Sequence, residues 1–175
     1  MCMVRLEEAK KMLNFTVGPV MSPDEVLYVA GQDAPYFRTP EFSDVVLRCE
    51  RAMLDLLHAP DGSRCVFLTA SGTGAMEAVV MDVLRPGEHV AVVNGGSFGQ
   101  RFVDLCCLHG HEVDEVRLDF GKQITREMLE SCVGDAVTAL LVNMHETSSG
   151  LLYDMPLISD FCRSRGITLL VDAVS

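Results

Sequence analysis

The sequence predicts an α/β protein, a three-layer α/β/α sandwich built on a mostly parallel sheet. Short apolar runs alternate with segments of helical periodicity from residue 65 onward, and this alternation is typical of parallel strands joined by helical crossovers. Several runs are apolar throughout, as strands covered on both faces are. Glycine and proline separate the segments at regular intervals, which marks the ends of the elements.

The composition narrows the class of protein. The chain has 175 residues, 49% of them hydrophobic, which is enough to form a globular core. Its net charge of -11 disfavours nucleic acid as a partner. We expect no membrane segment and a cytoplasmic location, because no apolar run could cross a bilayer and residues 1–13 carry charges. Seven cysteines without a C-x-x-C pattern favour reduced thiols and predict no metal site.

The first part of the chain predicts an arm followed by a helix. Four turn-forming pairs that end in proline interrupt residues 1–40, so we expect an amino-terminal arm there and a domain over residues 41–175. Apolar side chains recur at helical spacing over residues 41–57, which predicts an amphipathic helix that ends before Pro60. No internal repeat or low-complexity segment is present.

The elements that follow alternate regularly. An apolar run predicts a strand at 65–70, helical spacing predicts a helix at 72–84, and Pro86 and Gly87 end that helix. The second apolar run predicts a strand at 89–93. The remaining expected elements are helix 98–108, strand 112–118, helix 125–132 opening on Thr125, strand 137–142, helix 155–165 closed by Gly166, and strand 167–171.

Residues 68–78 combine an apolar strand, small residues and a helix start. Ser71 and Thr73 offer hydroxyls, and Gly72 lets backbone N–H groups approach an anion at the positive end of a helix. A phosphate site is one interpretation. The other is a turn of small residues that packs a helix onto a sheet, since neither a G-x-G-x-x-G nor a G-x-x-x-x-G-K-[ST] pattern is present.

Polar residues also follow the other expected strands. Phe98 lies just after a turn at 94–97, Thr147 follows another strand, and Asp172 ends the last one. Ligands of open α/β sheets bind beyond the carboxyl ends of the strands, so one crevice could collect these residues. Taken singly, each residue also has a plainer interpretation as a turn, a cap or a core side chain.

The order and spacing of these segments resemble the class V aminotransferase group of fold-type I pyridoxal-phosphate enzymes. This group includes alanine–glyoxylate, serine–pyruvate and 2-aminoethylphosphonate–pyruvate transaminases. The resemblance implies that the chain corresponds to the first half of the large, cofactor-binding domain. The matching segments are residues 16–19, 23–26, 38–42, 71–78, 94–101, 145–150 and 171–175.

The resemblance also implies a site for pyridoxal 5'-phosphate. Its expected cofactor contacts are Ser71, Gly72 and Thr73 on the phosphate, Phe98 stacked on the ring, Thr147 near the ring hydroxyl, Asp172 on the pyridinium nitrogen and Val174 packed against the ring. Gly18 and Arg38 are expected near the substrate. A carboxylate beside the ring nitrogen keeps that nitrogen protonated, so the ring can accept electrons.

The catalytic lysine of the family is expected beyond the strand that ends in residues 171–175. The lysines of this chain are Lys10, Lys11 and Lys122, and none lies at that place in the motif order. We therefore expect no catalytic residue within these 175 residues, a chain truncated before the lysine and the carboxyl-terminal domain, and no activity of the chain alone.

Two functional hypotheses follow, with a third from another fold family. The first is an aminotransferase that moves an amino group from a small amine or amino acid to pyruvate or glyoxylate, as a homodimer in its full-length form. The alternative is a truncated, non-catalytic cofactor-binding or subunit-interaction module. A nucleotide-binding Rossmann domain would need a glycine fingerprint that is absent. The identity of the amino donor stays open.

Overall fold

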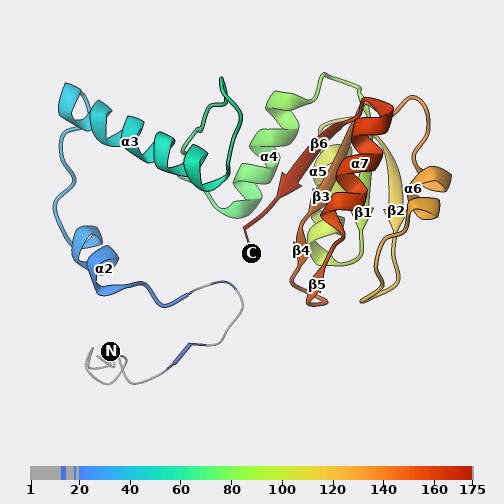
Figure 1. Ribbon diagram of the computed structural model, residues 1–175, viewed down its shortest axis with the longest axis horizontal. Coiled ribbons are helices and arrows are strands. Elements are labelled where there is room, and N and C mark those ends of the chain that lie inside the picture. Colours follow the sequence, from blue (N-terminus) through green and yellow to red (C-terminus); the bar gives the residue numbers. More distant parts are fainter. Residues whose placement is uncertain (1–12, 15–17, 19, 175) are drawn as a thin grey trace. The chain divides into compact units, whose positions relative to one another are not determined.

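The structure is a computed structural model that describes residues 13–14, 18 and 20–174, and its chain forms two compact units (Figure 1). The first unit comprises residues 1–67 and the second residues 68–175. The expected boundary between residues 40 and 41 stays a prediction, while the helix expected just after it belongs to the first unit.

Two helices lie in the described residues of the first unit. α2 spans Asp24–Ala30, within the segment expected to be an arm, and α3 spans Pro40–Leu56. Thr39 begins α3 by accepting a hydrogen bond from the backbone N–H of Phe42 at 3.2 Å, and Pro40 occupies the first helical position. The helix expected at 41–57 is thus confirmed, although several of its apolar side chains stay exposed.

The prediction of a strand at residues 65–70 is wrong, because these residues form no strand. The side chains of Val66, Phe67 and Leu68 are 77%, 51% and 54% exposed. An apolar run becomes a strand only where a neighbour completes its backbone hydrogen bonds, and the four strands of the main sheet pair with one another instead. The backbone N–H of Cys65 donates to Glu50 Oε1 at 3.0 Å.

The second unit is built on a parallel four-stranded sheet. Its strands are β1 (His89–Asn94), β2 (Glu112–Arg117), β3 (Ala139–Asn143) and β6 (Thr168–Asp172). They lie in the order β2-β1-β3-β6, and each neighbouring pair is parallel. The four strands expected over residues 89–171 are confirmed within a few residues at each end.

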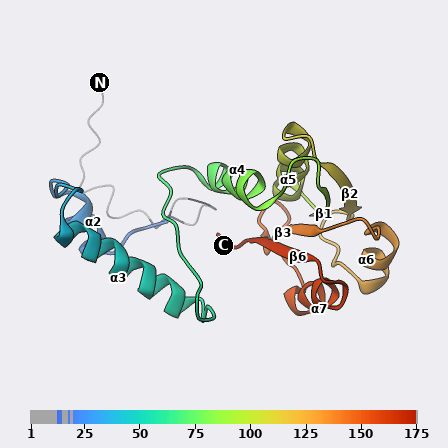
Figure 2. The same cartoon turned by 90° about the horizontal axis from the view of Figure 1, so that it is seen from above.

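Helices cover both faces of this sheet. They are α4 (Gly72–Val83), α5 (Ser97–Leu108), α6 (Arg126–Cys132) and α7 (Met155–Arg165). Seen from above, α4 and α5 lie on one face and α6 and α7 on the other (Figure 2). The expected three-layer α/β/α sandwich is confirmed.

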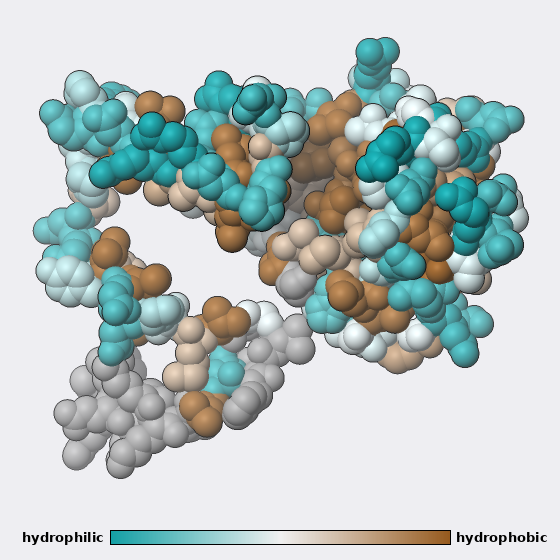
Figure 3. Space-filling model, in the orientation of Figure 1, coloured by the Kyte–Doolittle hydropathy of each residue, from teal (hydrophilic) through white to brown (hydrophobic). Residues whose placement is uncertain are grey.

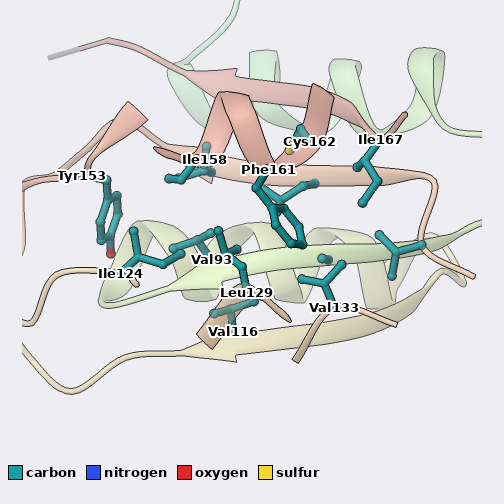
Figure 4. Packing of buried hydrophobic residues seen from close by; sticks show 14 of the residues in the cluster. Val93, Val116, Ile124, Leu129, Val133, Tyr153, Ile158, Phe161, Cys162 and Ile167 are labelled. Atoms are coloured by element: carbon teal, nitrogen blue, oxygen red, sulfur yellow. The ribbon is translucent and has the colours of Figure 1, made fainter. Parts of the chain in front are cut away.

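The alternation of side chains along β1 divides the core in two. Ala91 and Val93 pack with α6 and α7, where Phe161, Ile158 and Leu129 fill the space (Figure 4). Val90 and Val92 point to the opposite face and pack with residues of α4 and α5. Both sets are fully buried, so β1 lies at the centre of the unit.

A small hairpin that was not expected follows β3. β4 (His145–Glu146) pairs with β5 (Leu151–Leu152) in antiparallel fashion. Elsewhere, large hydrophobic side chains remain exposed on both units (Figure 3), among them Val171 and Val174 at the end of the second unit. No helix in the described part of the chain is long and apolar enough to cross a membrane.

Candidate functional site

The carboxyl ends of β1 and β3 form the point at which the order of the sheet reverses. From β1 the chain continues to β2 on one side and then to β3 on the other. Open α/β sheets bind ligands in the crevice at such a point. α5 begins directly after β1, the hairpin with Thr147 follows β3, and β6 ends nearby on Asp172. The fold therefore gathers three of the expected site segments at one edge.

The amino terminus of α4 forms the turn expected to hold phosphate. Ser71 caps the helix, and its hydroxyl accepts a hydrogen bond from the backbone N–H of Gly74 at 3.2 Å. The first N–H groups of a helix have no intrahelical acceptor, so those of Gly72 and Thr73 are suited to an anion. A Cβ atom on Gly72 would meet nothing within 4 Å, and the space beside it is open.

A cavity of about 240 Å³ connects this turn to the end of β6. Gly72, Asp172 and Val174, three of the expected cofactor contacts, all line it. Asp172 is partly buried, and its Oδ1 accepts a hydrogen bond from the backbone N–H of Val174 at 3.3 Å. Phe98 and Thr147 do not line this cavity, whose aromatic wall is Phe102.

Glu146 connects the start of α5 to the hairpin. Its side chain is completely buried, and its two carboxylate oxygens accept five hydrogen bonds. The donors are the backbone N–H groups of Phe98 (3.4 Å), Gly99 (3.1 Å) and Ser148 (3.3 Å), Asn143 Nδ2 (3.1 Å) and the Ser148 hydroxyl (2.5 Å). The carboxylate thus occupies the positive end of α5, where a negative charge is stabilised. It fixes Phe98 beside the turn that carries Thr147.

The hydrogen bonds decide the ionisation of Glu146. Burial alone would raise the pKa of this carboxyl, but the bonds from Ser148, Gly99 and Phe98 outweigh it and lower the pKa below 4.5. The negative charge of Glu146 acts in turn on its neighbour Tyr153. Burial, assisted by that charge, raises the pKa of Tyr153 to about 12. Glu146 is therefore ionised at neutral pH and Tyr153 is not.

Arg101 contacts two of the expected cofactor-binding residues, Thr73 and Phe98. Its Nη1 donates to the Thr73 hydroxyl at 3.0 Å, and its guanidinium carbon lies 5.0 Å from the centre of the Phe98 ring. Thr73 belongs to α4, while Phe98 and Arg101 are one turn apart on α5. The structure thus joins the expected phosphate turn to the expected stacking ring through a side chain to which the sequence analysis gave no role.

Comparison with known proteins identifies the family. Residues 27–175 match the sequence profile of the family described as Aminotransferase class-V. The chain belongs to the class-V aminotransferase family. Members of this family generally use pyridoxal 5'-phosphate, so the resemblance found from the motifs is confirmed.

Individual relatives agree with this assignment. The chain is 30% identical over 137 residues to a 2-aminoethylphosphonate–pyruvate transaminase of Polaromonas sp., covering 77% of this chain and 37% of that protein. It is 28% identical over 170 residues to the soluble hydrogenase 42 kDa subunit of Anabaena cylindrica, covering 94% of this chain and 44% of that protein. Against each of these relatives the chain spans less than half of the relative's length.

A solved structure shows the same fold. An alanine–glyoxylate aminotransferase from Nostoc sp. superimposes with a TM-score of 0.81 at 21% identity, over 96% of this chain and 47% of that one. An aspartate aminotransferase of subgroup IV from Thermus thermophilus superimposes with a TM-score of 0.78 at 27% identity, over 88% of this chain and 43% of that one.

Two expected substrate contacts of this class-V aminotransferase chain lie in the first unit. Gly18 has a φ of 107°, a conformation that favours glycine. Arg38 Nη1 donates to the Tyr36 hydroxyl at 3.5 Å, and its guanidinium lies 4.7 Å from the centre of the Phe37 ring. Their contact with substrate stays a prediction, as do all the expected cofactor contacts, including those of the residues that line the cavity.

Sequence reasoning missed Glu146 and Arg101 as parts of the site. Arg101 lies three positions after Phe98 on a helix, and residues at that spacing share a face, so its proximity to the ring could have been expected. The burial of Glu146 could not, because a charged residue in a polar turn is ordinarily exposed. Its partners Gly99 and Phe98 are 47 and 48 positions away in the chain.

Proposed function

We propose that this chain forms the cofactor-binding part of a pyridoxal-phosphate-dependent aminotransferase that passes an amino group from a small amine or amino acid to pyruvate or glyoxylate. The observation that carries the proposal is the cavity lined by both Gly72, the first residue of α4, and Asp172. The names of the Polaromonas and Nostoc relatives support the acceptor class. A homodimer in the full-length form and a cytoplasmic location are part of the same proposal.

The residues present fit this cofactor. Met76, Val79 and Leu170 give the cavity apolar walls suited to an aromatic ring, and Asp172 is its carboxylate. The helix end at Gly72 offers backbone N–H groups to a phosphate. Pyridoxal 5'-phosphate carries a group to match each of them: an aromatic ring for the apolar walls, a basic nitrogen for the carboxylate and a phosphate for the N–H groups.

Each residue would have a distinct task. When bound, the cofactor supplies an electron-accepting ring. Asp172 would hold a proton on the ring nitrogen, since a carboxylate nearby stabilises the charged form of its partner. Ser71, Gly72 and Thr73 would bind the phosphate, and Val174 would pack against the ring and exclude water. Phe98 lies outside the lining of this cavity, and its place on the ring rests on the family resemblance alone. Thr147 would donate a hydrogen bond near the ring hydroxyl.

The replacement Asp172→Asn tests the proposal directly. We expect the chain to bind pyridoxal 5'-phosphate in equilibrium dialysis and the variant to bind it about tenfold more weakly, because a charge-assisted hydrogen bond becomes a neutral one. Asp160→Asn is a matched control, since Asp160 pairs with Arg163 on the exposed face of α7. Equal affinities of the Asp172→Asn variant and the unmodified chain would contradict the role of Asp172.

The replacement Gly72→Ala separates ligand binding from folding. The added methyl group meets no atom of the chain within 4 Å, so we expect the free energy of unfolding to change by less than about 1 kcal/mol. The same methyl group projects into the open space beside the turn and should weaken the binding of phosphorylated ligands. Urea unfolding followed by circular dichroism, together with dialysis, measures the two effects. A variant that binds normally would count against a phosphate at Gly72.

The alternative is a non-catalytic cofactor-binding module, and for these 175 residues taken alone it is supported by the position of the described lysine. Lys122 lies in the turn between β2 and α6, where its backbone N–H bonds Asp119, and it does not line the cavity. We expect borohydride reduction of the loaded chain, followed by peptide mass mapping, to reveal no lysine adduct at the cavity. Efficient transamination by the 175-residue chain alone would contradict this alternative.

A further inference from the structure

The phosphate turn has no positive charge of its own. Helix α4 carries Glu77 and Asp82 and neither lysine nor arginine, in a chain with a net charge of -11. A phosphate monoester carries a charge of about -1.5 to -2 at pH 7, and a helix terminus supplies only about half a positive charge. A cation close to this turn would therefore strengthen the binding of a phosphorylated ligand relative to an unphosphorylated one.

Arg101 is placed to be that cation. Its Nη1 lies 3.0 Å from the Thr73 hydroxyl, within the turn itself. In the described part of the second unit, no carboxylate lies within ion-pair distance of Arg101, whereas four other arginines each have one: Arg117, Arg126, Arg163 and Arg165. Within that part of the chain, no acidic side chain therefore neutralises the charge of Arg101.

The contact with Thr73 also has a direction. Arginine can only donate, so the Thr73 hydroxyl is the acceptor in this bond and its own proton is left to donate to another group. On the other side, the guanidinium lies 5.0 Å from the centre of the Phe98 ring, a distance at which a cation is attracted to an aromatic face. One side chain thus holds both the hydroxyl and the ring in place.

We propose that Arg101 makes this site selective for phosphorylated ligands, by orienting the Thr73 hydroxyl as a donor and supplying the positive charge that the turn lacks. The inference rests on the proposed function and names the residue that would distinguish pyridoxal 5'-phosphate from pyridoxal. Arg101 is a positioning residue, since it acts on the phosphate through Thr73 and the field of its charge.

The test compares the two ligands. The 175-residue chain is dialysed separately against pyridoxal 5'-phosphate and pyridoxal, and the ratio of the two affinities is measured. We expect Arg101→Met to reduce that ratio about tenfold, the worth of one charge-assisted contact, with a much smaller effect on pyridoxal. Arg101→Lys should restore part of the ratio. Arg163→Met removes an equal charge from the exposed face of α7 and should leave the ratio unchanged.

A second variant makes the test independent of any folding defect in the first. Thr73→Val removes the hydroxyl, and we expect it to reduce the ratio as well. Adding Arg101→Met to Thr73→Val should then reduce the affinity ratio by a smaller factor than Arg101→Met does alone, because the two residues act as a pair. An unchanged ratio in Arg101→Met, or an equal loss of affinity for both ligands, would overturn the inference while leaving the proposed function intact. An unmodified chain that binds neither ligand would overturn both.

Discussion

Replacing Glu146 by leucine is expected to lower the free energy of unfolding of the second unit by about 3 kcal/mol or more, because buried donors lose their acceptor. Gly99 and Asn143 are buried and donate to this carboxylate at 3.1 Å. Leucine offers them no acceptor, and water has no access to the site. Urea unfolding followed by circular dichroism measures the loss, a suitable probe because the chain has no tryptophan.

Glu146→Gln isolates the contribution of the charge. The folded state lowers the pKa of Glu146 below 4.5, so its ionised form stabilises the fold above the unfolded pKa, and this contribution is lost as the pH falls through the folded pKa. The difference in unfolding free energy between the unmodified chain and Glu146→Gln should therefore be largest near neutral pH and shrink below pH 4.5.

Glu130→Gln is the control for this pair of variants. Glu130 lies on α6 with a 58% exposed side chain, in an ion pair with Arg126 at 3.5 Å, and its replacement should change the unfolding free energy by less than about 0.5 kcal/mol. Hydrogen exchange gives a local readout, since the amides of Phe98 and Gly99 should lose protection in Glu146→Leu. Unchanged protection there would show that the carboxylate does not anchor α5.

Replacing Gly99 by alanine is expected to have the second large effect. A Cβ atom on Gly99 would lie 2.6 Å from the Val93 carbonyl oxygen and 2.7 Å from Asn94 Cα, both backbone atoms at the end of β1. Neither atom can rotate away, so α5 must shift from the sheet. We expect a loss of about 1 to 3 kcal/mol, although alanine is the better helix former by about 1 kcal/mol.

Gly72→Ala is the matched control for this effect. Both glycines lie in the first turn of a helix, but a methyl group on Gly72 meets open space. Thermal unfolding should therefore distinguish the two variants clearly. Equal melting temperatures would mean that the close approach of α5 to β1 does not require glycine.

The sequence predicted the four paired strands and the main helices because their determinants are local. Helical spacing of apolar residues located α3, α5 and α7, and Thr125 and Gly166 marked helix ends that the structure confirms. Continuous apolar runs located β1 and β3, which are buried on both faces. Where the determinant was not local, prediction failed, as in the strand expected at 65–70.

The sequence by itself determined the family, the alternation of strands and helices, and the residues that follow each strand. The order of the motifs is enough to identify the family. The residues that follow each strand are placed together because the carboxyl ends of parallel strands meet at one edge of the sheet, whatever the details of packing. Only the tertiary structure decided that Glu146 accepts hydrogen bonds from the first turn of α5, that Arg101 donates to Thr73, and that Gly72 and Asp172 line one cavity. These contacts join residues 28 to 100 positions apart, and pairing between such distant residues depends on how the helices pack on the sheet.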